Sequence, residues 1–366
     1  MELKHIVFFV STLDTGGIEN YLLRFLTFNN GLFRPTIICK LNKLGELEKE
    51  FRKIDHINII PMDLGFTNLG SYYKLISFFK QSNTYSICDF TGNFSGLVML
   101  VGRISKVNKR VSFYRNSSYR FNPTLLKRIY FKFLNSLVIY NSTKILSNSE
   151  HAFEVFFNKV NRGLNFQVIN NGIDYEDFLS KRSRLTRNQL NIPKDAIVIG
   201  HTGRYTPAKN HTMIYKIAKK LVTEENNIYV VLCGKDTENF IDLIKDNSLL
   251  TERCILLGYR SDIPSVLELM DVFLFPSITE GQPNSLIEAM VMNLPFVASD
   301  IPSIRETIPE YEISNLVNLL DEDGFTESIK VKINTLQDRR KKSIKEWTLS
   351  KYNPNVLFNL FLNQIL

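Results

Sequence analysis

Short apolar runs alternate with amphipathic segments from one end of the chain to the other. The apolar runs are rich in β-branched and aromatic residues, and their lengths are typical of buried strands. They predict strands in the first half at residues 5–10, 34–40, 57–62, 85–90, 110–114, 144–149 and 166–170. The pattern restarts in the second half at residues 196–203, 228–234, 254–258, 272–277 and 295–300. Strands that alternate with helices predict an α/β fold whose parallel sheets carry helices on both faces.

A polar segment, "KRSRLTRNQLNIPKD" at residues 181–195, separates the two halves of this pattern. The chain has 366 residues, which is more than one ordinary core accommodates. We therefore predict two doubly wound domains, at residues 1–180 and 190–350, with this segment as the linker. Ligands of doubly wound domains bind at the carboxyl ends of the strands, so we expect the ligand in a cleft between the domains.

The composition, 44% apolar and 22% charged, is that of an ordinary globular protein. The cysteines lie in apolar runs without zinc or redox spacing, which is typical of reduced core residues in a cytosolic protein: Cys39, Cys88, Cys233 and Cys254. No stretch approaches the ~18 apolar residues that a membrane span needs, and the apolar run at the N-terminus is too short for a signal peptide. We expect a cytoplasmic protein that at most sits on the inner membrane face.

The net charge of +8 is unevenly distributed, because residues 90–149 contain ten Lys and Arg residues but no Asp or Glu. In this zone a predicted helix opened by Pro123 mixes Lys127, Arg128 and Lys132 with Leu, Ile, Phe and Tyr. Cations beside exposed aromatic residues suit an anionic membrane surface. The alternatives are a solvated basic face over a core helix, or a groove for an acidic acceptor. No nucleic-acid recognition motif accompanies the charge, so nucleic acid is not an expected partner.

The first predicted strand leads through a polar turn into Gly16 and Gly17, and a helical pattern follows. Paired glycines permit close approach of the backbone, and a helix N-terminus offers unpaired N–H groups to an anion. The dinucleotide fingerprint GxGxxG is absent. Turn geometry alone explains the glycine pair equally well.

In the second half, Arg204 and Lys209 flank a short loop between a strand and a helix that begins near Asn210. The Arg fork and the Lys point charge together suit a diphosphate. The alternative is a pair of solvated cations at a strand exit.

Two glutamates follow the strand at 272–277: Glu280 in a predicted loop and Glu288 in the second turn of a helix that starts near Asn284. Carboxylates accept hydrogen bonds, so these two suit the hydroxyl groups of a sugar ring and a ribose. We expect free backbone N–H groups at the start of the helix, on Asn284, Ser285 and Leu286. Two acids and two cations around one nucleotide-sugar form a consistent arrangement.

Several motifs, in chain order, resemble the signature of retaining glycosyltransferases of the GT-B fold (GT4, or glycosyl transferases group 1). The resemblance covers nearly the whole chain and rests on Gly16-Gly17, "NNGID" at 170–174, "GRYTPAKN" at 203–210, "LLGYRSDIPSVLELMDVFLFPS" and Glu280-x7-Glu288 followed by "AMVMNLPFVASDIPSIRE". It implies two Rossmann-like domains facing a cleft, with a C-terminal helix at 353–366 that crosses back onto the first domain.

The resemblance also implies roles for particular residues. Arg204 and Lys209 would bind the diphosphate, Glu288 the ribose and Glu280 the donor sugar. The backbone near Gly203, Tyr259 and Arg260 would hold the rest of the donor, while Gly16 and Gly17 would let the first domain approach it. Many relatives carry a His after the fifth strand, where this chain has "YRNSS". Arg115, Asn116 or Ser117 would take that place on the acceptor side, and His151 is a further candidate there.

The implied reaction is retaining transfer of a hexosyl or N-acetylhexosaminyl group from a nucleotide-diphosphate donor, with UDP-sugar the expected one. The implied acceptor is a glycan or polyprenyl-linked glycan in surface polysaccharide synthesis. No cofactor and no metal are expected, and we interpret "DED" at 321–323 as an acidic turn before a helix. The rival interpretations are a nucleotide-sugar epimerase of the same architecture and a non-catalytic, glycan-binding member of the family.

Overall fold

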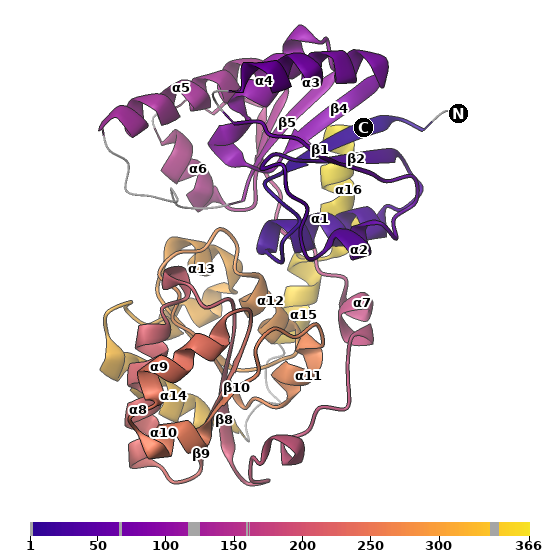
Figure 1. Cartoon of the computed structure of the whole chain (residues 1–366). Coiled ribbons are helices and arrows are strands. Elements are labelled where there is room, and N and C mark those ends of the chain that lie inside the picture. The colour runs from indigo at the N-terminus through magenta and orange to yellow at the C-terminus, as the bar shows by residue number, and fades with distance from the viewer. Residues whose placement is uncertain (1–2, 66–67, 116–124, 159, 161, 337–343) are drawn as a thin grey trace. The chain divides into compact units, whose positions relative to one another are not determined.

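The computed structural model describes residues 3–65, 68–115, 125–158, 160, 162–336 and 344–366 (Figure 1). The chain divides into two compact units. The first comprises residues 1–172 and 354–366, and the second residues 173–353. The boundary therefore falls earlier than the sequence pattern suggests, and the polar segment 181–195 belongs to the second unit.

The first unit is built on a parallel sheet, which has seven strands within the described residues, in the order β3-β2-β1-β4-β5-β6-β7. The strands are β1 (His5–Val10), β2 (Arg34–Cys39), β3 (Asn58–Pro61), β4 (Thr84–Asp89), β5 (Lys109–Tyr114), β6 (Lys144–Ser147) and β7 (Phe166–Val168). The helices are α1 (Gly17–Phe28), α2 (Glu48–Phe51), α3 (Leu69–Gln81), α4 (Gly96–Ile104), α5 (Leu125–Asn141), α6 (Glu150–Phe157) and α16 (Pro354–Ile365), with a 3₁₀ turn η1 (Gly92–Ser95).

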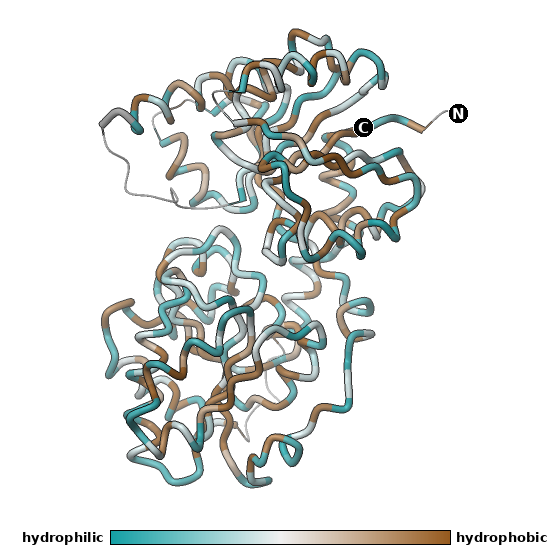
Figure 2. The backbone as a smooth tube through the Cα atoms, viewed as in Figure 1, coloured by the Kyte–Doolittle hydropathy of each residue, from teal (hydrophilic) through white to brown (hydrophobic). Residues whose placement is uncertain are grey.

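Both faces of this sheet are covered, as the apolar sequence of β1 requires. Successive side chains of a strand point to opposite faces. Ile6, Phe8 and Val10 therefore join the core shared with α1 and α16, while Val7 and Phe9 join the core under α3 and α4 (Figure 1). Hydrophobic residues are concentrated along the strands in Figure 2.

The C-terminal helix α16 is part of the first unit. Phe358 and Phe361 pack on the rings of Tyr21 and Phe25 of α1, with Phe25 and Phe361 only 4.5 Å apart between ring centroids. Buried aromatic pairs of this kind contribute both apolar area and specific ring geometry. The apolar face of residues 354–365 is thus buried against α1.

The second unit carries a smaller parallel sheet, which has five strands within the described residues, in the order β10-β9-β8-β11-β12. The strands are β8 (Ile197–Thr202), β9 (Ile228–Cys233), β10 (Cys254–Leu256), β11 (Val272–Phe275) and β12 (Phe296–Ala298). The helices are α7 (Tyr175–Ser180), α8 (His211–Glu224), α9 (Ile241–Ile244), α10 (Ser248–Arg253), α11 (Ile263–Glu268), α12 (Asn284–Val291), α13 (Pro302–Thr307), α14 (Glu322–Asn334) and α15 (Ile344–Lys351). The 3₁₀ turns are η2 (Asn188–Leu190), η3 (Pro207–Lys209), η4 (Thr237–Phe240) and η5 (Glu310–Asn315).

The segment that the sequence suggested as a linker is fastened to this second unit. Arg187 donates to the carbonyl of Leu269 and to the carboxylate of Asp271, at 2.7 Å in each case. Ser183 is hydrogen-bonded to Asp262 and Ser265. The polar side chains of residues 181–195 therefore make hydrogen bonds to the rest of the second unit.

All twelve predicted strands are confirmed, but several end earlier than predicted. The predicted strand at 272–277 ends at Phe275, and the one at 295–300 ends at Ala298. Beyond Phe275 and Ala298 the chain makes side-chain hydrogen bonds, such as Ser299 Oγ to the carbonyl of Ser277 at 2.5 Å. The residues that were predicted as strand but follow the observed strand ends form loops at the carboxyl edge of the sheet.

In each unit the strand order reverses direction once, between β1 and β4 in the first sheet and between β8 and β11 in the second. Loops leaving neighbouring strands at such a point run to opposite faces and open a crevice, where ligands of doubly wound domains bind. The two reversal points therefore direct attention to the loops after β1 and β4 and to the loops after β8 and β11. Among the described helices, none combines the length and the apolar composition that crossing a membrane requires.

Candidate functional site

Three glycines lie at the carboxyl ends of β8, β9 and β10: Gly203, Gly234 and Gly258. We call this group the glycine floor. Gly203 donates its N–H to the Cys233 carbonyl, and Gly234 donates to the Gly258 carbonyl at 2.8 Å. A Cβ on Gly234 would lie 2.1 Å from the Gly203 oxygen, and Gly234 and Gly258 both have positive φ, +152° and +60°. Sequence reasoning singled out Gly203 only. The signal for the other two was a glycine directly after each apolar run.

The loop after β8 places Lys209 against this floor. It closes with the 3₁₀ turn η3 and with Asn210 in the left-handed region at φ 56°, a conformation that Asn tolerates better than most residues. A Cβ on Gly203 would lie 2.8 Å from Nε2 of His201 and 3.1 Å from Cε of Lys209, so glycine here lets both side chains pack against the end of β8. Arg204 is exposed on the same loop.

The loop after β11 is tied to the loop after β8. The N–H of Ile278 donates to the carbonyl of Ala208 at 2.8 Å. Lys209 Nζ then meets Glu280 Oε1 at 2.7 Å and lies 4.6 Å from the ring centroid of Phe275. The structure thus brings together the cation assigned to the diphosphate and the acid assigned to the donor sugar. Both groups are half-buried, which strengthens their attraction relative to an exposed pair.

Helix α12 begins at Asn284 as predicted, and Glu288 is buried in its second turn. One expectation at its start was wrong: the Leu286 N–H donates to the Pro283 carbonyl at 3.1 Å and is not free for a ligand. Pro283 occupies the N-cap and turns its carbonyl toward the first turn. Within the described part of the chain, the Ser285 N–H has no backbone acceptor.

Arg260 and Tyr259 lie on the loop after β10. Arg260 makes a bidentate ion pair with Asp262, with both nitrogen–oxygen distances at 2.7 Å. This pair raises the pKa of Arg260 and lowers that of Asp262. The guanidinium is therefore engaged locally, while Tyr259 is exposed. Its backbone remains the candidate for contacts with a ligand.

Two buried histidines support the Lys209 loop from below. His201 on β8 and His211 at the start of α8 stand with their ring centroids 5.4 Å apart, and Tyr205 packs on His211. Burial lowers the pKa of His201 well below its usual range and that of His211 to about 4. Both are neutral at pH 7. Their sequence spacing gave no hint of this pairing, because one lies on a strand and the other on a helix.

In the first unit, Gly16 caps α1 and Gly17 opens it, at the carboxyl end of β1. Gly16 has φ −159°, which is extended backbone that any residue adopts, and neither glycine has a positive φ. The turn therefore does not require this glycine pair. Close approach of another group to this backbone stays a prediction.

Arg115 follows β5 and is only 6% exposed. Its Nη2 donates to Asn171 Oδ1, and its guanidinium lies over the Tyr21 ring, 3.6 Å from the ring centroid. Burial lowers the pKa of Arg115 to about 10, so it stays charged at neutral pH. Asn116 and Ser117 lie outside the described residues. His151 is on α6, and its Nδ1 is 3.5 Å from Glu154 of the same helix.

Sequence reasoning missed a buried ion pair in this unit. Lys40, at the end of β2, donates to Asp89 at 3.0 Å, to Thr91 Oγ1 at 2.9 Å and to the Phe94 carbonyl at 2.8 Å. Asp89, at the end of β4, accepts from both the N–H and the hydroxyl of Thr91. The available signal was a charged residue at the end of each of two apolar runs.

The acidic triplet at 321–323 is a helix start, as predicted. Asp321 caps α14 and accepts a hydrogen bond from the Gly324 N–H at 2.8 Å. Among the described residues, no three His, Cys, Asp or Glu side chains are grouped so that they could hold a metal ion. The expectation of a metal-free reaction stays a prediction.

Known proteins share sequence with the part of the chain that forms this site. The family model of glycosyl transferases group 1 matches residues 183–346, which include the loops after β8 and β11 and helix α12. The chain is 31% identical over 174 residues to the UDP-Gal:alpha-D-GlcNAc-diphosphoundecaprenol alpha-1,3-galactosyltransferase of Escherichia coli. This alignment covers 45% of the chain and 44% of that enzyme.

Two further similarities extend over most of the chain. The capsular polysaccharide biosynthesis glycosyltransferase CapM of Staphylococcus aureus is 24% identical over 79% of the chain and 78% of its own length. The structure of Anabaena HepE in complex with UDP and glucose has a TM-score of 0.78, with 18% identity and 98% of each chain covered. That structure shares the fold. The chain is thus similar to the glycosyl transferases group 1 over residues 183–346, and to a polysaccharide glycosyltransferase over most of its length.

Proposed function

We propose that the protein is a retaining glycosyltransferase that moves a sugar from a UDP-sugar to a lipid-linked glycan in polysaccharide biosynthesis. The observation that carries the proposal is the Lys209–Glu280 pair, set on a glycine floor at the reversal point of the second sheet. The name of the E. coli relative specifies a UDP-sugar donor and a diphosphoundecaprenol-linked acceptor, which supports this donor and this class of acceptor.

Lys209 and Arg204 would hold the diphosphate and stabilise the negative charge that grows on it as the glycosidic bond breaks. Preorganised cations aimed at developing charge give the largest single contribution to many enzymatic rates. The glycine floor supports this role, because a Cβ on Gly203 or Gly234 would collide with Lys209 or with the backbone at Gly203 and Arg204, so these glycines let the loop that carries both cations pack in its place.

Glu280 would accept hydrogen bonds from hydroxyls of the donor sugar, and Glu288 from the ribose. Carboxylates near a diphosphate would repel it unless a cation lay between them. Lys209 provides this charge at 2.7 Å from Glu280. The backbone at Tyr259 and Arg260 would contact the base, with the Arg260 side chain held aside by Asp262.

The acceptor hydroxyl would attack on the face that the diphosphate leaves, and a phosphate oxygen would take its proton. This route needs no protein base, no metal ion and no cofactor. Activity should persist in EDTA, and a loss of activity that manganese restored would contradict this part of the proposal. Arg115, at the carboxyl end of β5, would act on the acceptor side, whereas Gly16 and Gly17 would let the loop after β1 approach the donor.

The outer face of α5 is proposed to contact an anionic membrane. Ile129, Phe133 and Tyr140 are exposed on it, and the exposed cations Lys127, Arg128 and Lys132 lie among them. Arg103 of α4 donates to the carbonyl of Tyr140 at 2.9 Å, which places a further cation beside this surface. Exposed apolar side chains among cations suit the boundary between lipid headgroups and acyl chains.

The proposed function is tested with a panel of UDP- and GDP-sugars, first by thermal shift and then by transfer to a diphosphate-lipid-linked N-acetylglucosamine. We expect a UDP-sugar to raise the melting temperature and to donate its sugar with retention, read by NMR of the product. Recovery of an epimerised nucleotide-sugar without transfer would favour the epimerase. Binding without any turnover of donor would favour a non-catalytic family member.

A further inference from the structure

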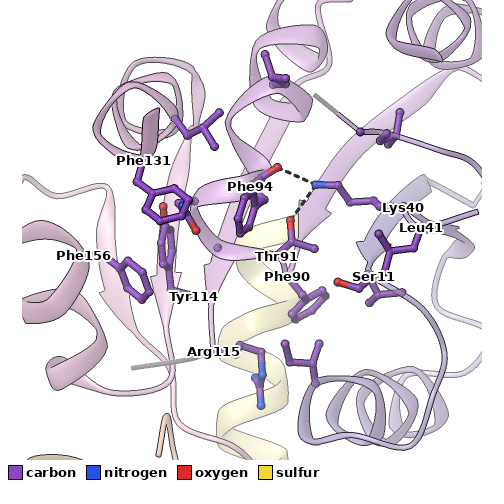
Figure 3. Close-up of a pocket in the computed structure, with 18 of the residues that line it drawn as sticks. Ser11, Lys40, Leu41, Phe90, Thr91, Phe94, Tyr114, Arg115, Phe131 and Phe156 are labelled. Atoms are coloured by element: carbon purple, nitrogen blue, oxygen red, sulfur yellow. Dashed lines mark hydrogen bonds between the residues drawn. The ribbon is translucent and has the colours of Figure 1, made fainter. Parts of the chain in front are cut away.

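The first unit contains a cavity of about 400 Å³ at the reversal point of its own sheet (Figure 3). Ser11 lines it after β1, Phe90 and Thr91 after β4, and Leu41 after β2. This is the crevice between β1 and β4 where a doubly wound domain is expected to bind a ligand. Its size is within the range of small-molecule sites.

One wall of the cavity is aromatic and aliphatic. Tyr114, Phe131 and Phe156 lie on the left of Figure 3, with Phe94 between Phe131 and Lys40. The rings of Phe94 and Phe131 are perpendicular, with centroids 5.8 Å apart. Phe131 is on α5, so this helix supplies part of the wall from its inner face. Such a wall excludes water and favours a hydrocarbon.

Among the described residues, the cations Lys40 and Arg115 also line the cavity. They differ in the number of hydrogen bonds that their donor groups make. The ammonium group of Lys40 makes three hydrogen bonds, to Asp89, Thr91 and Phe94. An ammonium has three donors, so Lys40 has none left for a ligand. Its role is to join the ends of β2 and β4.

Arg115 is different. Within the described part of the chain, its Nε and Nη1 are buried without a hydrogen-bond acceptor. Glu19 lines the same cavity, and its charge helps to keep Arg115 protonated from a distance. A buried guanidinium with unsatisfied donors is costly, and an anion that accepts from both nitrogens would offset that cost.

We propose that this cavity binds the hydrocarbon of an isoprenyl diphosphate, with the diphosphate at Arg115 and the first isoprene units against the wall that includes Phe131. This inference rests on the proposed function, and it identifies which part of a lipid-linked acceptor the first unit recognises. The chemistry is an apolar, unsaturated chain joined directly to a phosphate anion. A free anion would use Arg115 alone, and a neutral lipid would use the wall alone.

Helix α5 lies between the cavity and the surface proposed for membrane contact. Phe131 is 9% exposed and lines the cavity, whereas Phe133, two residues later, is 51% exposed on the outer face. One helix thus contributes Tyr130 and Phe131 to the cavity lining and Phe133 to the surface proposed for membrane contact. A lipid held at that surface would have a short path to the cavity wall.

The test is calorimetric titration of the whole chain, without detergent, with farnesyl diphosphate, inorganic pyrophosphate and farnesol. We expect farnesyl diphosphate to bind at least tenfold more tightly than either part. Phe131→Ala should weaken its binding at least fivefold and leave pyrophosphate binding unchanged. Arg115→Gln should weaken both anions. Phe133→Ala is the matched control on the same helix and should leave the affinity for farnesyl diphosphate in solution unaltered.

A second variant keeps the test decisive if Phe131→Ala disturbs packing. Leu97→Trp places a larger side chain into the lining and should exclude the chain, with at least tenfold weaker binding of farnesyl diphosphate. Equal effects of Phe131→Ala and Phe133→Ala, or equal affinities for farnesyl diphosphate and pyrophosphate, would overturn the inference.

Failure of this inference and failure of the proposed function give different results. Phe131→Ala and Leu97→Trp can each be assayed for transfer to a lipid-linked acceptor. An unchanged acceptor KM in both variants would contradict the binding role of the cavity and leave the proposed glycosyltransferase activity standing. If farnesyl diphosphate binds with the expected pattern but the protein transfers no sugar, the binding role of the cavity stands and the proposed reaction is contradicted. The melting temperature of each variant without ligand, compared with that of the wild type, verifies that the variant is folded.

Discussion

At the scale of single residues, the chemistry of the second unit depends on charges held in partly dry surroundings. Lys209 and Glu280 are half-buried, so their attraction is less screened than that of a surface pair. Lys216, one turn into α8, makes a 3.5 Å ion pair with Glu322 at the surface. The two lysines are close in sequence, but only the first lies on the glycine floor.

Lys209→Ala should lower kcat at least a hundredfold while the fold is retained. Removing one preorganised charge from such a site costs ~2 to 4 kcal/mol of transition-state stabilisation. Steady-state kinetics with the identified donor provide the measurement, and Lys216→Ala is the matched control that should keep the wild-type rate. A Lys209→Ala variant as active as the wild type would remove Lys209 from the donor site.

Glu288→Gln tests the contact with the ribose separately. The amide keeps one acceptor oxygen but loses the charge, so donor affinity should fall by roughly 1 to 3 kcal/mol, the value of a charge-assisted hydrogen bond. Titration of the nucleotide-sugar by calorimetry measures the change. An unaltered dissociation constant would assign Glu288 to the stability of α12 instead.

At the scale of elements, the loop after β8 is supported by a strand and a helix that meet through His201 and His211. The perpendicular rings fill the space between β8 and α8, beneath the backbone that carries Arg204 and Lys209. Nδ1 of His201 also donates to the Leu274 carbonyl of β11 at 3.0 Å. The two loops at the reversal point thus share one buried support.

This support should make the second unit sensitive to acid. The pKa of His211 falls from 6.5 to about 4 on burial, so the unfolded chain binds a proton between these values and the folded chain does not. Stability is therefore fully present above pH 6.5 and is lost as the pH falls through about 4. At about 1.4 kcal/mol per pKa unit, the loss approaches roughly 3 kcal/mol.

Urea unfolding at a series of pH values checks this expectation. His211→Phe keeps a ring of similar size without a titratable group, and it should flatten the decline in unfolding free energy between pH 6.5 and 4. An equally steep decline in the variant would show that other groups, among them the carboxylates, cause the acid sensitivity.

At the scale of the whole molecule, charge is segregated along the chain. Residues 90–149 carry ten cations and no acid, and they supply α4, β5, α5 and β6 of the first unit. Residues 48–53 of the same unit, at helix α2, mix both signs, with Arg52 and Lys53 paired to Glu48 and Glu50. Only the first surface has the sign and the exposed apolar residues that an anionic membrane favours.

Replacing Lys127, Arg128 and Lys132 together by Gln should reduce binding to anionic vesicles more than a hundredfold. Each cation near anionic lipid contributes ~1 kcal/mol, and the effect fades within a Debye length. Co-sedimentation at low salt measures the loss, and high salt should release the wild type. Lys49, Arg52 and Lys53 replaced by Gln provide an equal change of charge at residues 48–53. Equal sedimentation of the wild type with neutral and anionic vesicles would exclude the membrane contact.

Local patterns in the sequence determined the elements and the class of fold. Each of the twelve strands is a short apolar run, and burial of both faces of a parallel sheet leaves a strand little choice of composition. The start of α12 at Asn284 likewise followed from Pro283, because proline suits the first positions of a helix and not its interior. These are properties of neighbouring residues, and no tertiary contact was needed to infer them.

Tertiary structure decided which of these residues meet. Lys209 and Glu280 are 71 positions apart, and Lys40 and Asp89 are 49 apart, so no local pattern could pair them. Helical spacing separates Phe131 from Phe133, but only the packing of α5 shows that Phe131 faces the cavity and Phe133 faces outward. The physical reason is that burial and charge pairing depend on which strand ends lie side by side, and the order of strands in a sheet is a property of the folded chain.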